Sequence, residues 1–162
     1  MSLFHCVSYL RYNDIWGDWH GGNSGNLFSF ETMVIGSYGV IRNNPNTWDY
    51  GLLGGISFKG NDGTIYGPYG GTEGDGWESN IPSSVSYISG RSGSLVDAIT
   101  FHHCCIDGPY GSVTGGSPWT DVNTFKENGQ LTAIEIRASG SAFYSIRARY
   151  STIQLFVHFG MN

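Results

Sequence analysis

Short stretches in which apolar and polar residues alternate recur along the chain, and glycine-rich segments separate them. The alternation is clear in Leu-Thr-Ala-Ile-Glu-Ile-Arg at 131–137 and in Ser-Ile-Arg-Ala-Arg-Tyr at 145–150. A period of two residues is typical of a strand with one buried face. The pattern predicts strands at residues 55–59, 84–88, 98–102, 131–137, 145–150 and 152–159, with almost no helix. Gly-rich turns between them indicate an all-β domain.

Composition supports this prediction. The chain has 162 residues, of which 25 are Gly and 15% are aromatic, while only 13% are charged. This length suits a single domain over residues 1–162. Gly at this level without a collagen period favours many tight turns, and the aromatic side chains supply apolar area for a core.

Charge and the chain ends restrict the partners. A net charge of −5 with 8 Lys and Arg leaves too few cations for a basic face, so we expect neither nucleic-acid binding nor attraction to anionic membranes. No apolar run approaches the roughly 20 residues that span a bilayer, and we expect no membrane insertion. Residues 1–6 show no basic segment followed by an apolar one, so we expect a cytoplasmic or non-classically secreted protein.

Two motifs repeat in the chain. Gly-Pro-Tyr-Gly-Gly-Thr-Glu-Gly at 67–74 returns as Gly-Pro-Tyr-Gly-Ser-Val-Thr-Gly at 108–115, and a looser glycine loop lies at 19–26. The second motif, Ser-Gly-Ser followed by two apolar residues, a variable residue, a small residue and Ile, occurs at 91–99 and 137–146, with a degraded copy at 50–56. The variable position is held by Gly54, Asp97 and Tyr144 in turn.

The two motifs alternate three times, in units of about 45 residues. Such a unit is long enough for a four-stranded sheet but cannot bury its apolar face alone. Three sheets packed around a pseudo-three-fold axis can bury these faces together. The sequence therefore predicts a three-fold all-β architecture.

On these motifs the chain resembles the jacalin-related lectins of the mannose-binding type, over about residues 16–150. The resemblance implies β-prism I: three four-stranded Greek-key sheets with pseudo-three-fold symmetry. It also implies a non-catalytic, carbohydrate-binding lectin without a cofactor. Members with an internal glycine loop usually favour mannose or glucose, so the expected partners are mannose- or glucose-containing glycans.

In this family a sugar site joins an Asp-bearing turn to a glycine loop, and the resemblance places it at Asp97. An ionised carboxylate accepts hydrogen bonds from two hydroxyls, and glycine lets the main chain approach the ring. Leu95 and Val96 would offer backbone N–H groups, and the loop that follows would contribute Gly115 and Gly116. Gly111 is expected to shape that loop, and Trp119 to lie on the sugar's apolar face. The alternative is that Asp97 only caps its own turn.

The other two units depart from the family pattern. Gly54 has no acceptor, so its site, with Gly70, Gly71 and Gly74, is expected to be silent unless Asp49 or Asp75 substitutes. Tyr144 is expected either to stack on a sugar in an altered second site or to be a partly buried aromatic cap. The residues of that second site are Tyr144, Phe143, Gly21, Gly22 and Gly25. One good site gives weak affinity, so we expect a homodimer, and the apolar ends, 4–12 and 152–159, are expected to be edge strands or dimer contacts.

Four further possibilities concern metal binding, the cysteines, catalysis and a decayed site. Adjacent residues on a strand point to opposite faces, so at most two of the residues at 102–105 (His-His-Cys-Cys) are expected to share an ion, and no metal site is predicted. The three cysteines, Cys6, Cys104 and Cys105, are expected to be reduced thiols, with an interchain bridge as the alternative. A glycosidase would pair Asp97 with Asp75, Asp107 or Asp121. A β-prism interaction module with a decayed sugar site is the remaining alternative.

Overall fold

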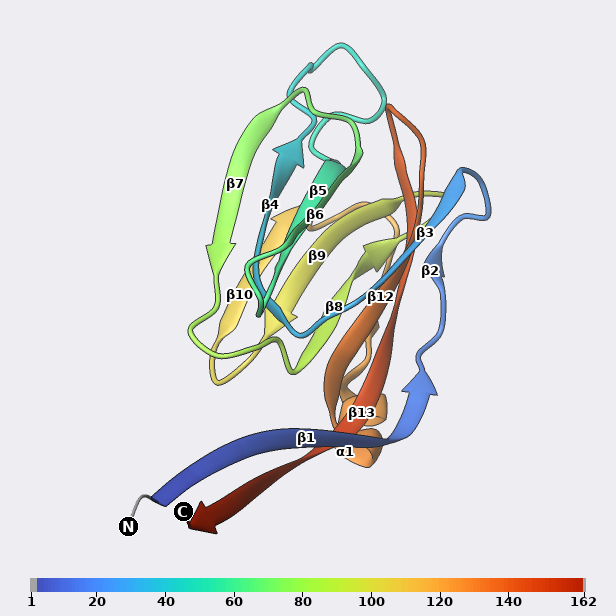
Figure 1. The fold of residues 1–162 in the computed structure, drawn as a ribbon. Helices are drawn as coiled ribbons and strands as arrows, with labels where there is room; N and C mark the ends of the chain where they lie inside the picture. Colours follow the sequence, from blue (N-terminus) through green and yellow to red (C-terminus); the bar gives the residue numbers. More distant parts are fainter. Residues whose placement is uncertain (1–2, 162) are drawn as a thin grey trace.

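The computed structural model of the protein describes the backbone of residues 3–161 and the side chains of residues 13–154. Strands dominate the described chain, as the sequence predicts (Figure 1). The elements are β1 (Leu3–Trp16), β2 (His20–Gly21), β3 (Asn26–Glu31), β4 (Val34–Ile41), β5 (Leu53–Gly60), β6 (Ile65–Gly70), β7 (Asp75–Asn80), β8 (Tyr87–Ser92), β9 (Val96–His102), β10 (Ile106–Gly111), β11 (Ser117–Thr120), α1 (Val122–Asn128), β12 (Gln130–Ala138) and β13 (Phe143–Met161).

The strands form three antiparallel sheets. The second sheet has the order β6-β5-β4-β7, and the third sheet has the order β10-β9-β8-β11. In both, the fourth strand returns beside the first, which is the Greek-key arrangement. The terminal sheet, β1-β13-β12-β3 with β2 also on β13, is assembled from both ends of the chain. Because β1 and β2 pair with successive stretches of β13, they share one edge position and complete the predicted three four-stranded sheets.

The core lies where the central strands of the three sheets meet. β5, β9 and β13 contact one another, and each contributes a buried isoleucine: Ile56, Ile99 and Ile146. These residues lie two positions after Gly54, Asp97 and Tyr144. Each variable residue is the second residue of its strand. Because the three isoleucines meet in the core, the three variable positions lie near one another at one end of the prism.

Gly39 in β4 and Gly90 in β8 occupy equivalent positions in the second and third sheets. Neither glycine belongs to the repeated motifs, and both are explained by steric contacts. A Cβ on Gly39 would lie 2.2 Å from the Gly55 carbonyl oxygen and 2.7 Å from the ring of Trp77. A Cβ on Gly90 would meet the Ala98 oxygen and the Trp119 ring at the same two distances. Only glycine leaves room for the indole ring over the sheet. The second and third sheets are therefore copies in packing as well as in topology.

The structure changes three details of the predicted elements. The segments at 145–150 and 152–159 are one strand, β13. The strand predicted at 84–88 begins later, at Tyr87. The N–H of Val85 donates instead to the carbonyl of Val34, which belongs to β4 in the second sheet (2.8 Å). Residues 103–105 are a hairpin loop between β9 and β10 instead of a strand end, so their side chains need not alternate.

The two ends of the chain pair with each other. Within β1 and β13, residues 4–12 lie opposite 152–160 in antiparallel register, and this ribbon extends away from the three sheets (Figure 1). The two apolar ends therefore pair with each other as neighbouring strands within one chain, and contact of these ends with a second chain stays a prediction. In the described part of the chain, no helix is long and apolar enough to cross a membrane.

Candidate functional site

The carboxylate of Asp97 lies directly beneath a glycine loop. Asp97 is the second residue of β9 and is 7% exposed. A Cβ added to Gly115 would be only 2.3 Å from Asp97 Oδ2, so the loop backbone approaches the carboxylate as closely as glycine allows. A Cβ on Gly111 would lie 2.2 Å from the Asp97 carbonyl oxygen. The structure thus brings together the residues that the repeat motifs paired.

The glycine loop, residues 112–116, is held in place by two side chains. Ser112 Oγ accepts from the N–H of Gly115 (2.8 Å) and from that of Thr114 (3.3 Å), while the Ser112 N–H donates to the Asp97 carbonyl (3.1 Å). Arg91 Nε donates to the Gly115 carbonyl at 2.8 Å, and its Nη2 donates to the next carbonyl at 3.0 Å. Arg91 is the first residue of the motif at 91–99, and the repeat pattern did not indicate this role. Arg91 lies on β8, the strand next to the one that carries Asp97, and its two bonds fix the position of the glycine loop.

Burial sets the electrostatics of Asp97. Removal from water disfavours the charged form and raises the pKa of Asp97, and the nearby Arg91 guanidinium opposes this rise. A partly desolvated carboxylate forms stronger hydrogen bonds than one in open water, provided that a ligand supplies the donors.

The remaining predicted residues of this site lie around Asp97. The Val96 side chain is buried in the core, so only its backbone faces the site, while Leu95 is half-buried on the turn before β9. Gly116 is exposed, and its φ of +63° lies in the left-handed region. A Cβ there would meet the Ser92 carbonyl oxygen at 2.6 Å. Both features require glycine at this position.

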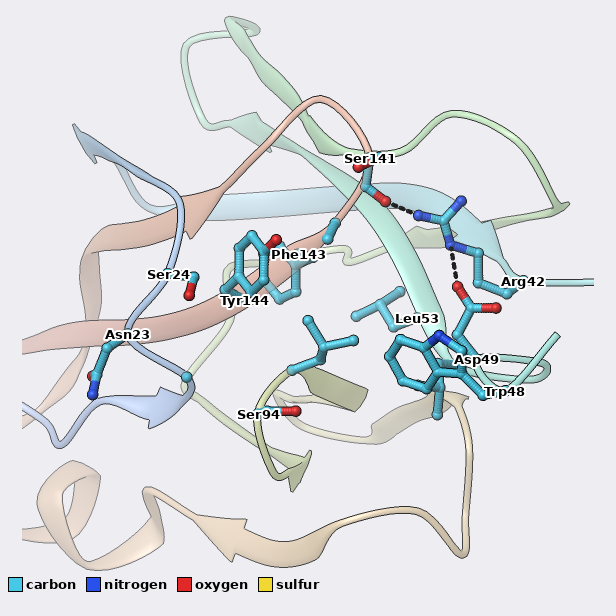
Figure 2. A pocket seen from close by; sticks show the side chains of 14 residues that line it. Asn23, Ser24, Arg42, Trp48, Asp49, Leu53, Ser94, Ser141, Phe143 and Tyr144 are labelled. Atoms are coloured by element: carbon cyan, nitrogen blue, oxygen red, sulfur yellow. Dashed lines mark hydrogen bonds and ion pairs between the residues drawn. The ribbon is translucent and has the colours of Figure 1, made fainter.

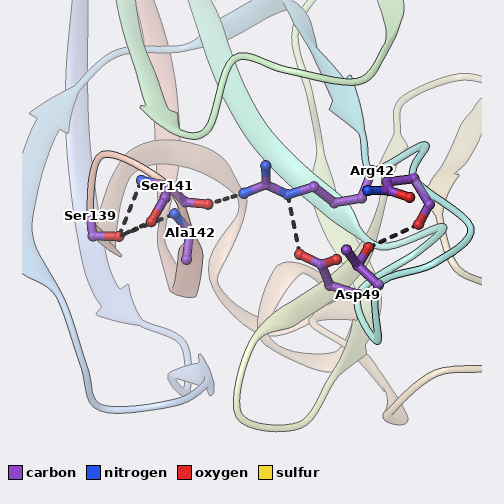
Figure 3. Close-up of polar contacts among 7 residues, drawn as sticks. Arg42, Asp49, Ser139, Ser141 and Ala142 are labelled. Carbon is purple, nitrogen blue, oxygen red and sulfur yellow. Dashed lines mark hydrogen bonds and ion pairs between the residues drawn. The ribbon is translucent and has the colours of Figure 1, made fainter.

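A guanidinium occupies the equivalent place in the second sheet. A Cβ on Gly54 would be 2.8 Å from Arg42 Nε, and a Cβ on Gly71 would be 2.8 Å from Arg42 Nη2. The Arg42 side chain pairs with Asp49 (Nε to Oδ2, 3.6 Å) and donates to the carbonyl of Ser141 on the turn after β12 (Figure 3). The space between Gly54 and Gly71 is therefore filled by a cation.

The two carboxylates considered as substitutes for Gly54 have other partners. Asp49 pairs with Arg42, as above, and Asp75 Oδ1 accepts from Asn43 Nδ2 at 3.0 Å. Arg42 and Asp49 belong to the long loop at 42–52, which replaces the short Ser-Gly-Ser turn of the other units. The loop brings its own charges, and these pair with each other across the position where the family has its Asp.

In the terminal sheet an aromatic ring lies beneath the glycine loop. A Cβ on Gly25 would be 2.8 Å from Cδ2 of Tyr144, and a Cβ on Gly21 would be 2.1 Å from the Tyr144 carbonyl oxygen. Phe143 is buried in the core, and Gly22 packs against the carbonyl of Ser94. Tyr144, near the C-terminal end of the chain, therefore lies against the first glycine loop, near the N-terminal end. Tyr144 is half-buried, with its ring where Asp97 has its carboxylate.

The other carboxylates proposed for a glycosidase are engaged elsewhere. Asp107 accepts from Ser79 Oγ and Tyr110 Oη, both at 2.5 Å. Asp121 is 4% exposed and bonds His20 Nε2 (2.8 Å) through Oδ1 and the buried Tyr150 hydroxyl (2.7 Å) through Oδ2. Both carboxylates are thus bonded to side chains outside the Asp97 site, whereas glycoside hydrolysis needs two carboxyl groups on either side of one bond.

Trp119 also has a structural partner. Its ring stacks on the His20 imidazole, with centroids 3.7 Å apart and an interplanar angle of 3°. One face of the indole is therefore covered by the terminal sheet. The ring links the third sheet to the terminal sheet.

Three Greek-key sheets around one core, with a carboxylate beneath a glycine loop, define a sugar-binding protein of the β-prism type. The sequence profile of the jacalin-like lectin domain matches residues 4–102, more than half of the chain, and the chain belongs to this family. The protein is accordingly a lectin, a carbohydrate-binding protein without catalytic activity.

Individual relatives agree with this assignment. Griffithsin from Griffithsia sp. (strain Q66D336) is 35% identical over 98 residues, which cover 59% of this chain and 76% of griffithsin. The agglutinin of Calystegia sepium has a similar fold, with a TM-score of 0.65 and 20% identity over 87% of this chain and 97% of its own. AcmJRL, a mannose-binding jacalin-related lectin from Ananas comosus, has a TM-score of 0.63 and 19% identity over 84% of this chain and 96% of its own.

Proposed function

We propose that this lectin binds glycans containing mannose or glucose through one principal site at Asp97. The observation that carries the proposal is the position of the Asp97 carboxylate directly beneath Gly115. Asp97 accepts hydrogen bonds from two neighbouring hydroxyls of a hexose, and the backbone N–H groups of Leu95 and Val96 and of the glycine loop complete the site. The equivalent places at Gly54 and Tyr144 hold a guanidinium and a phenol ring, which leaves Asp97 as the main acceptor.

Two considerations support the mannose or glucose preference. The glycine loops lie inside the chain, which in this family goes with mannose or glucose. A fold relative from Ananas comosus is described as mannose binding, and one from Morus nigra was solved in complex with mannose. Galactose is the competing hexose, and it serves as the comparison ligand.

The test is isothermal titration of methyl α-mannoside, methyl α-glucoside and methyl galactoside into wild type and Asp97→Asn. Asn keeps the shape of the side chain but loses its charge and one acceptor, and we expect at least about a tenfold loss of affinity. Asp62→Asn is the matched control, because Asp62 is an exposed turn carboxylate that bonds the N–H of Thr64.

Each outcome bears on a different part of the proposal. Binding by wild type that is unchanged in Asp97→Asn would place the sugar elsewhere. Preferential galactose binding would overturn the specificity. If wild type bound no glycan on an array, an interaction module with a decayed site would be the better description.

We also propose that the protein acts as a homodimer. One principal site per chain gives weak affinity, and two linked sites raise the apparent affinity through effective concentration. Sedimentation equilibrium tests this directly: a mass near twice that of the chain supports the proposal, and a monomer at micromolar concentration contradicts it.

A further inference from the structure

A hollow of about 490 Å³ opens beside the Asp97 turn, where loops from all three sheets meet. This volume lies within the range of small-molecule sites, about 300–1,000 Å³. Three segments line it together with the first glycine loop: the long loop at 42–52, the turn before β9, and the turn before β13. Figure 2 shows Trp48 and Tyr144 on either side of this hollow, with Ser94 at its edge.

The lining is amphipathic in the way that a sugar ring is. Trp48 and Tyr144 offer apolar ring faces, while Asn23, Ser24 and Ser94 offer donors and acceptors. Trp48 is 81% exposed, so almost all of its indole is available to a ligand. An indole has a large apolar face and one polar N–H, which suits contact with a ligand that is partly apolar and partly hydrated.

The loop that carries Trp48 is well anchored. Main-chain bonds close it at its base, from the Arg42 N–H to the Leu52 carbonyl (2.9 Å) and from the Gly51 N–H to the Arg42 carbonyl (2.8 Å). The Arg42 side chain adds the ion pair with Asp49 and the bond to Ser141 (Figure 3). Arg42, which fills the space between Gly54 and Gly71, thus fixes the loop that carries Trp48.

The hollow borders the turn that leads into the principal site. Leu95 lines the hollow and lies two residues before Asp97. We propose that the hollow is a second subsite, in which the next hexose of an oligosaccharide bound at Asp97 stacks on Trp48. This inference rests on the proposed function, since it requires a hexose at Asp97.

The experiment compares a monosaccharide, methyl α-mannoside, with mannotriose in calorimetric titrations of wild type, Trp48→Ala and Tyr50→Ala. Tyr50 lies in the same loop and is 58% exposed but does not line the hollow, so it is the matched control. We expect wild type to bind mannotriose about three- to tenfold more tightly than the monosaccharide, as one aromatic contact allows. Trp48→Ala should lose this advantage and keep the monosaccharide affinity, and Tyr50→Ala should keep both.

The failures are distinguishable. If Trp48→Ala keeps the advantage, or weakens both sugars equally, the subsite is refuted while the Asp97 site stands. If wild type binds neither sugar, the proposed function itself fails, and the subsite with it.

A second inference rests on a different part of the molecule, the hairpin loop between β9 and β10. The loop consists of His103, Cys104 and Cys105, closed by a bond from the His103 N–H to the Cys105 carbonyl (3.0 Å). Both cysteines are exposed free thiols. The expectation that at most two of these residues share an ion assumed a strand and is wrong, because the hairpin loop turns all three ligand atoms to within 4.8 Å of one another.

Two separations between these atoms match those in a tetrahedral zinc site. Cys104 Sγ lies 3.7 Å from Cys105 Sγ and 3.5 Å from His103 Nδ1. Zinc binds sulfur at about 2.3 Å and histidine nitrogen at about 2.0–2.1 Å, so tetrahedral ligands are separated by about 3.8 Å between sulfurs and about 3.6 Å between sulfur and nitrogen. We propose that His103, Cys104 and Cys105 form a zinc site with three protein ligands and an open fourth position.

The test uses cobalt(II), which takes zinc sites and shows thiolate-to-metal absorption. We expect reduced wild type and Cys6→Ser to bind one equivalent with this absorption and to release it to added zinc. Cys104→Ser and His103→Ala should bind at least about tenfold more weakly. Equal binding by Cys104→Ser, no thiolate absorption in wild type, or a disulfide between the two adjacent cysteines in the isolated protein would each overturn the site.

Discussion

The glycine at position 115 provides a direct test of how the sugar site is built. In Gly115→Ala the new methyl carbon would lie 2.3 Å from Asp97 Oδ2 and 3.1 Å from Ser112 Oγ. Van der Waals repulsion does not allow two non-bonded atoms to lie this close, so either the loop or the carboxylate has to move by roughly 1 Å. Arg91 holds the Gly115 carbonyl at 2.8 Å, which resists movement of the loop. The displacement therefore falls mainly on the Asp97 carboxylate.

The expected size of the effect follows from the bonds that are lost. A hydrogen bond to a charged group contributes about 1.5–3 kcal/mol, and loss of one such bond to a hexose hydroxyl weakens binding about 10- to 150-fold. Stability should change little. The backbone of Gly115 lies outside the left-handed region, so Ala can adopt it. Ala lowers the conformational entropy of the unfolded chain, which stabilises the folded state by about 0.4–1 kcal/mol and offsets part of the steric cost.

The assay is calorimetric titration with methyl α-mannoside, together with urea unfolding of the same samples. Gly93→Ala is the matched control, because a Cβ on Gly93, in the turn before Asp97, would meet no atom within 4 Å. We expect normal binding in the control and weak binding in Gly115→Ala, with similar unfolding midpoints. Unchanged affinity in Gly115→Ala would refute the account, and so would an equal loss in both variants.

Three further predictions concern protonation, the buried network and the altered site. Because burial raises the pKa of Asp97, its carboxylate takes up a proton at a higher pH than an exposed carboxylate does. Sugar affinity should therefore fall as the pH drops through that raised pKa, while the sugar-free fold should lose stability as the pH rises through the same window. Sugar titrations and urea unfolding between about pH 7 and pH 4 check both. Tyr150→Phe should lower the free energy of unfolding by about 1–3 kcal/mol, since Asp121 Oδ2 loses its buried donor, and urea denaturation with a change below about 0.5 kcal/mol would contradict this. Tyr144→Asp should place a carboxylate beneath Gly25 and raise the sugar stoichiometry from one to two in a calorimetric titration, whereas an unchanged stoichiometry in a folded variant would count against the equivalence of the sites.

The strands that sequence patterns predicted are the ones whose burial sets the pattern. In β12 most side chains are buried and the more accessible ones include Glu135 and Arg137, so the alternation is visible in the sequence. The edge strands β6 and β7 are largely exposed and rich in Gly, and no strand was predicted there. Pairing with a neighbour stabilises such strands, and pairing leaves little trace in local composition. The seven-residue α1, with no buried residue, left no apolar stripe to detect.

The candidate site divides in the same way. Asp97 and Gly115 could be paired from the repeat order together with the family resemblance, because both motifs keep their spacing along the chain. Arg42 could not be placed, since the loop at 42–52 has no counterpart in the other units. Its guanidinium reaches Gly71 only because β4, β5 and the glycine loop meet in three dimensions. Trp48 was missed for the same reason.

The fold explains how three equivalent places can differ without loss of the domain. In each unit the buried isoleucine and the variable residue lie on the same central strand, two positions apart, but only the isoleucine packs in the core. The variable residue lies at the end of the prism, where a carboxylate, an aromatic ring or a bare glycine filled by Arg42 can each be accommodated beside a glycine loop. Stability therefore depends on the isoleucines of all three units, while the proposed sugar recognition depends on Asp97. In the second unit Arg42 fills this space, and its bonds to Asp49 and Ser141 fix the loop that carries Trp48 beside the turn that leads to Asp97.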